Sequence, residues 1–140
     1  IGASGAAGGA GNTITTTGSV ISFANGVNSA TPININSNTT QLEVLAADSA
    51  TQSGVISETA GPRGFEKIGT GTLTLAANNT YSGATTISAG TLQVDDKRNL
   101  GNDSATNSLV FNGGTLSSRA DITMARSVVV LKTFVNTSVK

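Results

Sequence analysis

The sequence of 140 residues has no cysteine, no histidine and no tryptophan, and only five aromatic side chains. Without cysteine and histidine, disulfides, thiolate or imidazole metal sites and Ser-His or Cys-His nucleophile pairs are excluded in this chain. Charged residues make up 11%, against roughly 25% in an average soluble domain. The eight basic and eight acidic residues balance, so the basic surface expected of a nucleic-acid-binding domain is also missing.

Long apolar runs are absent as well. The longest run of large apolar residues is Val128–Leu131, which is far too short to span a bilayer. Residues Ile1–Ser4 have neither the basic start nor the apolar core of a signal peptide, and the sequence does not begin with methionine. We therefore expect a processed product, or an excised piece, of a longer protein.

Small polar residues dominate what is present. Ser, Thr, Asn and Gly make up nearly half of the chain, and Leu, Ile, Val and Phe about a quarter. This many large apolar residues at zero net charge predicts a folded domain, not a disordered chain. We expect residues 1–12, rich in Gly and Ala, to form a lead-in segment and residues 13–140 to form the domain. The alternative for the lead-in is a strand of tiny side chains that another backbone can approach closely.

From Thr13 onward, apolar residues alternate with Thr, Ser, Asn or Gln over short stretches bounded by turn residues. Such alternation is typical of strands that bury one face. The best helical candidate is residues 42–53, and its Thr-rich flanks argue against it. The sequence predicts an all-β protein with short strands at residues 20–23, 33–35, 42–45, 55–57, 73–75, 92–94, 109–111 and 122–124.

One tripeptide repeats. Gly-Thr-Leu occurs at positions 71–73, 90–92 and 114–116. Successive copies therefore begin roughly 20 residues apart. An interval of roughly 20 residues fits one coil of a parallel β-helix, and we expect about six short coils in a rod roughly 30 Å long. Inside, stacked Leu, Val and Ile would form a narrow core where large aromatics fit poorly, and outside, Thr and Ser would form ladders. Asn25-Gly26 and Asn112-Gly113 also fit the hairpin turns of an antiparallel sandwich, the alternative architecture.

Residues 61–94 resemble a known repeat. The pattern has a Lys, then Gly-x-Gly-x-Leu-x-Leu, then Asn-x-Tyr-x-Gly-x-Thr, and finally Gly-x-Leu-x-Val. It is similar to the passenger-associated transport repeat of autotransporter passenger domains. The matching residues are Lys67, Gly69, Gly71, Leu73, Leu75, Asn79, Tyr81, Gly83, Thr85, Ile87, Gly90, Leu92 and Val94. Phe65-Glu66 departs from the plainer residues that many copies have before the Lys.

The resemblance implies a right-handed β-helix outside a Gram-negative bacterium. Members of this family are exported through an outer-membrane barrel and act as adhesins, toxins or other virulence factors. The repeat itself is associated with efficient secretion and folding. The chain would then be a passenger segment, extracellular or on the cell surface.

The motif residues also have a physical interpretation of their own. Its glycines suit positive φ or close approach between coils, and its asparagines suit turn caps or an amide ladder. We expect Tyr81 to cover a coil edge with its hydroxyl in water. These structural roles are expected for Gly69, Gly71, Gly83, Gly90, Asn78, Asn79 and Tyr81.

The only carboxylate cluster follows Val94. It includes Asp95, Asp96 and Asp103, with Asn99 and Asn102 between them. The spacing does not fit a calcium loop, and Lys97-Arg98 lies inside it, so we expect a solvated turn.

A carboxylate pair for polysaccharide hydrolysis would draw on Asp95, Asp96 or Asp121. It would need a defined separation across a groove and aromatic side chains that stack on sugars, and the chain has one tyrosine and no tryptophan. We therefore predict no enzyme activity, no catalytic residues, no metal and no cofactor, and leave the ligand-binding residues open.

The strongest apolar strand lies near the C-terminus, at residues 128–131 and 134–135. We expect a last strand that is buried against the next coil of the longer parent protein. The alternative is an edge that pairs with another subunit by strand addition. Two functions remain open. The first is a non-enzymatic surface segment that acts as adhesin or spacer and contacts a host-surface or matrix ligand. The second is a subunit that self-associates end to end into an extracellular fibre.

Overall fold

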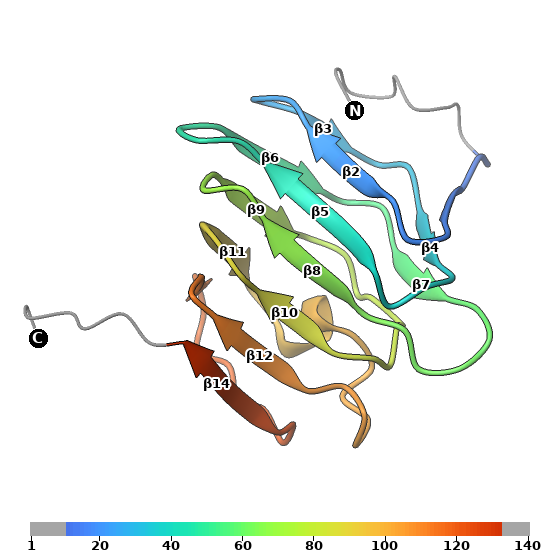
Figure 1. The fold of residues 1–140 in the computed structure, drawn as a ribbon, viewed down its shortest axis with the longest axis vertical. Helices are drawn as coiled ribbons and strands as arrows, with labels where there is room; N and C mark the ends of the chain where they lie inside the picture. Colours follow the sequence, from blue (N-terminus) through green and yellow to red (C-terminus); the bar gives the residue numbers. More distant parts are fainter. Residues whose placement is uncertain (1–10, 133–140) are drawn as a thin grey trace, which may run out of the picture.

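The computed structural model describes residues 11–132, which form a stack of short strands with corners between them (Figure 1). The polypeptide runs through each level of the stack and then steps to the next, from β1 and β2 to β14. Within this range no helix is long or apolar enough to cross a membrane. The expected lead-in at residues 1–12 lies almost wholly outside the described residues.

The strands are two to five residues long, as the short alternating segments predict. They are β1 Ile14–Thr16, β2 Val20–Phe23, β3 Asn28–Ser29, β4 Ile33–Ile35, β5 Thr40–Val44, β6 Ser49–Gln52, β7 Ile56–Glu58, β8 Phe65–Ile68, β9 Thr72–Leu75, β10 Thr85–Ile87, β11 Thr91–Val94, β12 Leu109–Asn112, β13 Thr115–Ser118 and β14 Val128–Lys132. One 3₁₀ turn, η1, spans Lys97–Leu100.

All the strand pairs are parallel, and they form three sheets. Sheet A has the order β1-β4-β7, sheet B the order β14-β12-β10-β8-β5-β2, and sheet C the order β13-β11-β9-β6-β3. The fold is therefore an all-β parallel solenoid of about five turns, which confirms the predicted class. Asn25-Gly26 and Asn112-Gly113 are corners between sheets B and C, not hairpin turns. The right-handed sense implied by the resemblance stays a prediction.

The Gly-Thr-Leu repeats stack directly on one another in sheet C. Thr91 of β11 lies between Thr72 of β9 and Thr115 of β13, and the leucines that follow keep the same register. Side chains of one row point inward and the alternate row outward, because successive residues of a strand face opposite sides. The repeat interval thus equals one turn of the solenoid.

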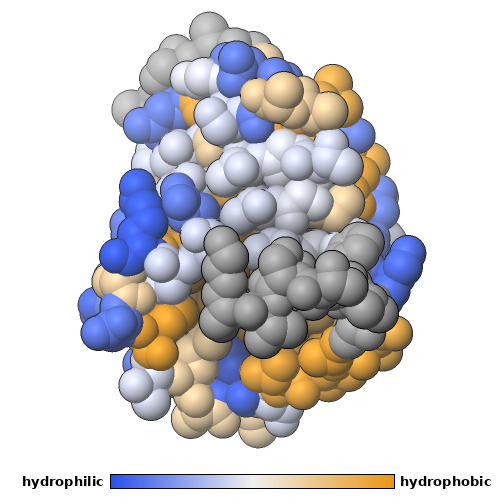
Figure 2. Space-filling model, turned by 90° about the vertical axis from the view of Figure 1, so that its left-hand side faces the viewer, coloured by the Kyte–Doolittle hydropathy of each residue, from blue (hydrophilic) through white to orange (hydrophobic). Residues whose placement is uncertain are grey.

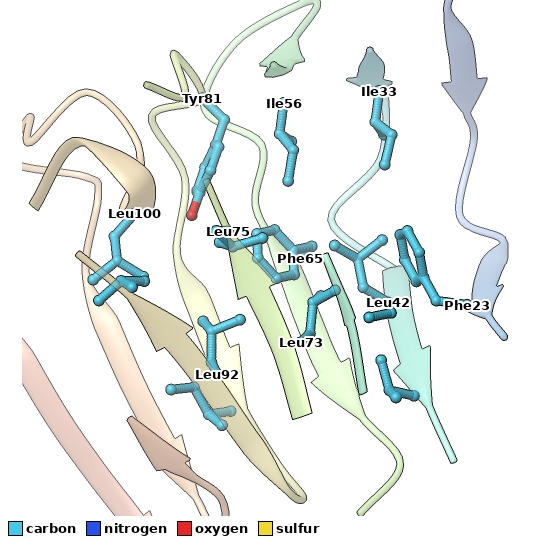
Figure 3. Close-up of a cluster of buried hydrophobic side chains, with 14 of the residues drawn as sticks. Phe23, Ile33, Leu42, Ile56, Phe65, Leu73, Leu75, Tyr81, Leu92 and Leu100 are labelled. Atoms are coloured by element: carbon cyan, nitrogen blue, oxygen red, sulfur yellow. The ribbon is translucent and has the colours of Figure 1, made fainter. Parts of the chain in front are cut away.

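The core is a single column of buried side chains inside the turns (Figure 3). Leu42, Leu73 and Leu92 are contributed by three successive levels and are at most 1% exposed. The expectation that large aromatics fit poorly there is wrong. The core accommodates Phe23, which lies beside Leu42, and Phe65 and Tyr81, which are buried further along the column.

Tyr81 is buried, so the expectation that its hydroxyl lies in water is wrong. Its side chain is 0% exposed, and its hydroxyl is hydrogen-bonded to Thr85 Oγ1 at 2.6 Å, so it does not reach water. Its ring meets Phe65 edge to face, with 5.5 Å between the ring centroids. A buried tyrosine needs a hydrogen-bond partner, and the inward Thr85, four residues later at the start of β10, supplies it.

The best helical candidate, residues 42–53, is not helical. It forms β5, a corner and β6, with Leu42, Val44, Ala50 and Gln52 buried on the inward row. Burial alternates with period two on both sides of the corner, and Ala47 at φ 62° makes the turn between them. The corner breaks any helical periodicity.

The last described strand, β14, is exposed in this chain, and its burial against a next coil of a longer protein stays a prediction. It pairs with β12 along one edge, and its other edge has no neighbour within the described residues. Its apolar side chains are 41–67% exposed and form the orange patch at the lower right of Figure 2. Residues 134–135, predicted as part of this apolar segment, lie outside the described range.

Candidate functional site

The carboxylates after β11 bind the chain's own arginines. Both side-chain nitrogens of Arg119 that face Asp95 donate to it, at 2.7 and 2.5 Å. Asp96 caps η1 by accepting from the backbone N–H of Arg98, and it accepts from the Arg98 side chain as well. The hydrogen bonds from Arg98 lower the pKa of Asp96 to about 2. Asp95 and Asp96 are thus each paired with an arginine at the exposed surface, as expected of a solvated turn.

Asp103 belongs to a separate group of charged residues, formed with Lys97 and Arg126. It lies 3.2 Å from Lys97 Nζ and 3.2 Å from Arg126 Nη2. Arg126 is buried and also donates to the backbone oxygens of Leu100 and Lys97. Arg126 thereby joins the segment before β14 to η1 and to Asp103.

The structure therefore separates the carboxylates that the sequence grouped. Asp95, Asp96 and Asp103 each have a different cationic partner, and Asp121 is exposed. Within residues 11–132, no group of three or more His, Cys, Asp or Glu side chains is placed to hold a metal ion.

Lys67 is a buried lysine, which the sequence pattern identified only as a residue of the repeat motif. It lies on the inward row of β8, between Leu42 and Ile87 of the neighbouring strands, and is 0% exposed. Its amine donates to the carbonyl oxygens of Ile68, Gly69 and Ala89, at 2.8, 2.7 and 3.3 Å. The alternation of the strand predicts this burial, because Lys67 is two residues after the buried Phe65 and therefore lies on the same side of β8.

Three carbonyl acceptors satisfy the three donors of the ammonium group. Burial nevertheless lowers the pKa of Lys67 to about 8, and the negative charge of Glu43 opposes this shift. The amine therefore remains mostly protonated at neutral pH, and it joins the corner after β8 to the corner of the next turn.

We expect the stability of the fold to rise with pH between about 8 and 9.5. In this range the unfolded chain, with a lysine pKa near 10.4, binds more protons than the folded chain, so deprotonation favours folding. The free energy of unfolding should increase by about 1 to 2 kcal/mol, measured by urea denaturation at each pH.

Lys67→Met should remove this rise, whereas Lys132→Met, at an exposed lysine of β14, should retain it. The range stops at pH 9.5 because Tyr81 acts in the opposite direction above pH 10. Its burial raises its pKa, so the free tyrosine of the unfolded chain ionises first. A rise that persists unchanged in Lys67→Met would contradict the assignment.

Buried amides link the turns on the side where sheet A ends. Asn79 Oδ1 accepts from the backbone N–H of Ile56, and Asn79 Nδ2 donates to the carbonyl of Asn99, at 2.8 and 2.6 Å. Asn99 in turn accepts from two backbone N–H groups and donates to Ala77. Each of these bonds joins a side-chain amide to a backbone group, so Asn79 has the expected role of a cap and is not a rung of an amide ladder. The neighbouring Asn78 is exposed.

The outer face of sheet C is an uncharged polar surface, which we call the sheet C face. None of the five strands of this sheet contains a charged residue. Its outward side chains form two rows, with neighbours on adjacent strands about 4.8 Å apart. The first row is Ser49, Thr72, Thr91 and Thr115, and the second is Asn28, Thr51, Thr74, Gln93 and Ser117.

Two shallow hollows lie on the outside of the solenoid. One, of about 300 Å³, is lined by members of both rows of the sheet C face, among them Thr51, Thr72 and Thr74. The other, of about 440 Å³, lies beside β8 and β10, where Gly64 and Gly83 leave room. Glu66 at its wall is already bonded to Gln41 Nε2 at 2.7 Å, so this second hollow has less free hydrogen-bonding capacity.

Comparison with known proteins agrees with the resemblance seen in the sequence. Residues 65–94 match the family model described as the passenger-associated-transport-repeat. Over 80 residues, 57% of this chain, the sequence is 41% identical to the adhesin BmaC autotransporter of Brucella suis biovar 1 (strain 1330). The matched stretch is only 2% of the length of that adhesin.

No solved structure matches the chain. The matched repeat coincides with β8 to β11. It includes Lys67 and Asn79, whose hydrogen bonds bridge successive turns, and Tyr81, whose ring contacts Phe65. The chain therefore contains a passenger-associated transport repeat of the autotransporter type, and over more than half of its length it is similar to an autotransporter adhesin.

Proposed function

We propose that this chain is a non-catalytic segment of an exported passenger, displayed on or released from a Gram-negative bacterium, and that it acts as adhesin or spacer. The observation that supports this most directly is the similarity to an autotransporter adhesin, together with the matched repeat. The uncharged sheet C face adds a contact surface with two rows of polar side chains. We also propose that the repeat aids secretion and folding by joining successive turns through buried polar groups.

Adhesion can be measured with the whole chain coated on beads and offered to cultured epithelial cells and to extracellular matrix. We expect saturable binding that soluble chain competes away. Beads coated with the same chain after heat unfolding are the matched control, because they present identical composition without the solenoid surface. Equal binding by folded and unfolded chains would contradict an adhesive role.

The exposed edge of β14 favours a second candidate function, end-to-end assembly into a fibre. Its valines and Leu131 are exposed, and Lys132 is the only charge on the strand. Natural edge strands are usually protected by charge or by a covering element. Light scattering over a hundredfold concentration range, with electron microscopy of the most concentrated sample, tests this. Fibres would support assembly, and a constant mass equal to that of a single chain would contradict it.

A further inference from the structure

We propose that the sheet C face binds a neutral polysaccharide, lying across the strands over the hollow of about 300 Å³. This inference rests on the contact function proposed above and names its class of ligand. The hollow is formed by outward hydroxyl and amide groups of β6, β9 and β11, with the small residues Gly26 and Ala50 at its edge. Its volume is at the low end of the range for small-molecule sites, as suits a short stretch of a longer polymer.

The hydroxyls of this face have unused hydrogen-bonding capacity. Within residues 11–132, six of the outward hydroxyls have no side-chain hydrogen bond, and the described bonds on the face are Thr74 to Gln93, at 3.1 Å, and Ser53 to Asn28, at 2.7 Å. The six are those of Ser49, Thr51, Thr72, Thr91, Thr115 and Ser117.

The other faces differ in this respect. In sheet A, Asn34 donates to Ser57 on the next strand, at 3.1 Å. On sheet B, Glu66 accepts from Gln41 and from Ser88 of the neighbouring levels. Several outward polar groups on those sheets thus bind one another, whereas the six hydroxyls of the sheet C face are left for water or for a ligand that replaces water.

Charge selects among hydrogen-bonding ligands. An anionic polymer gains affinity from a basic surface, and the strands of sheet C have no lysine or arginine. A neutral polysaccharide presents hydroxyls at regular intervals, which match donors and acceptors repeated about every 4.8 Å along each row. Single hydroxyl contacts are weak, but repeated contacts along one polymer add through effective concentration.

The test is a titration of the ¹⁵N-labelled full chain with cellohexaose, maltohexaose and mannohexaose, followed by amide chemical shifts. We expect shift changes concentrated on the strands of sheet C for at least one of these sugars. Thr51→Val, Thr72→Val and Thr74→Val combined should weaken that binding at least tenfold. Valine keeps the shape and strand preference of threonine but removes the hydroxyl. Thr86→Val, on the outer row of sheet B, is the matched control and should not change the affinity.

Mapping on the unmodified chain keeps the test valid if the triple variant misfolds. Shift changes away from sheet C, or full binding by a folded triple variant, would overturn the proposal. Salt-sensitive binding of heparin would also overturn it, because it would show that the ligand is an anionic polymer. If no sugar binds while coated beads still adhere to cells, the ligand class is wrong and the adhesive function stands. If the beads also fail to adhere, the proposed adhesive function itself is wrong and the spacer role is left.

Discussion

Gly90→Ala is expected to destabilise the solenoid by more than about 3 kcal/mol, or to prevent folding altogether. Gly90 has φ 63° at the corner before β11, where an L-residue loses roughly 1 to 2 kcal/mol. A Cβ at this position would lie 2.3 Å from the carbonyl oxygen of Gly71, in the turn below. That oxygen accepts from the N–H of Thr91, so it cannot move without breaking a bond between turns.

Gly26→Ala is the matched control for this prediction. Gly26 also has positive φ, 76°, at the equivalent corner after β2, but nothing lies within 4 Å of an added Cβ. It should lose only the conformational part, about 1 to 2 kcal/mol. Urea denaturation followed by circular dichroism measures both variants. Equal losses would show that close approach between turns contributes nothing at Gly90.

Asn79→Ala should lower the free energy of unfolding by about 2 to 4 kcal/mol. Truncation leaves the N–H of Ile56 and the carbonyl of Asn99 without their partner, in a region where Asn79 is only 4% exposed. Each unsatisfied buried backbone group costs about 1 to 3 kcal/mol, more than the bond itself contributes. Because one amide joins three levels of the solenoid, the effect should exceed that of any outward asparagine.

The neighbouring Asn78 is exposed and provides the control, since Asn78→Ala should change stability by less than about 0.5 kcal/mol. Asn79→Asp adds a second comparison, because it keeps an acceptor for Ile56 but places an oxygen against the carbonyl of Asn99. We expect it to be at least as destabilising as alanine. Losses of similar size at positions 78 and 79 would contradict the assigned role.

How much of the fold was available from the sequence is clearest in the Gly-Thr-Leu repeats. Period-two alternation and a repeat interval of one coil predicted parallel stacking, and the registers of β9, β11 and β13 confirm it. Positive φ at Gly69 and Gly90 was predictable too, because few other residues adopt it. About six coils were expected, and about five turns are present within residues 11–132, the later ones without a strand in sheet A.

The candidate site was less predictable. Asp96 and its partner Arg98 are two residues apart, so this pair is local. The partners of Asp95 and Asp103, Arg119 and Arg126, are determined by the packing of the last turns. Lys67 was visible as an inward position, yet the three carbonyl oxygens that accept from it belong to two different corners. Partners that lie a full turn apart in the sequence depend on corner lengths, which differ from turn to turn.

By itself, the sequence determined the strands, the parallel stacking and the family of the repeat, because each depends on local alternation or on a motif. Tertiary structure alone decided which polar groups are buried and which are left free. Tyr81 is enclosed because its ring packs against Phe65 and its hydroxyl binds Thr85, and β14 is exposed because no described strand follows it. The hydroxyls of the sheet C face remain unpaired because their neighbours across strands are other short hydroxyls about 4.8 Å away, beyond direct hydrogen-bond reach.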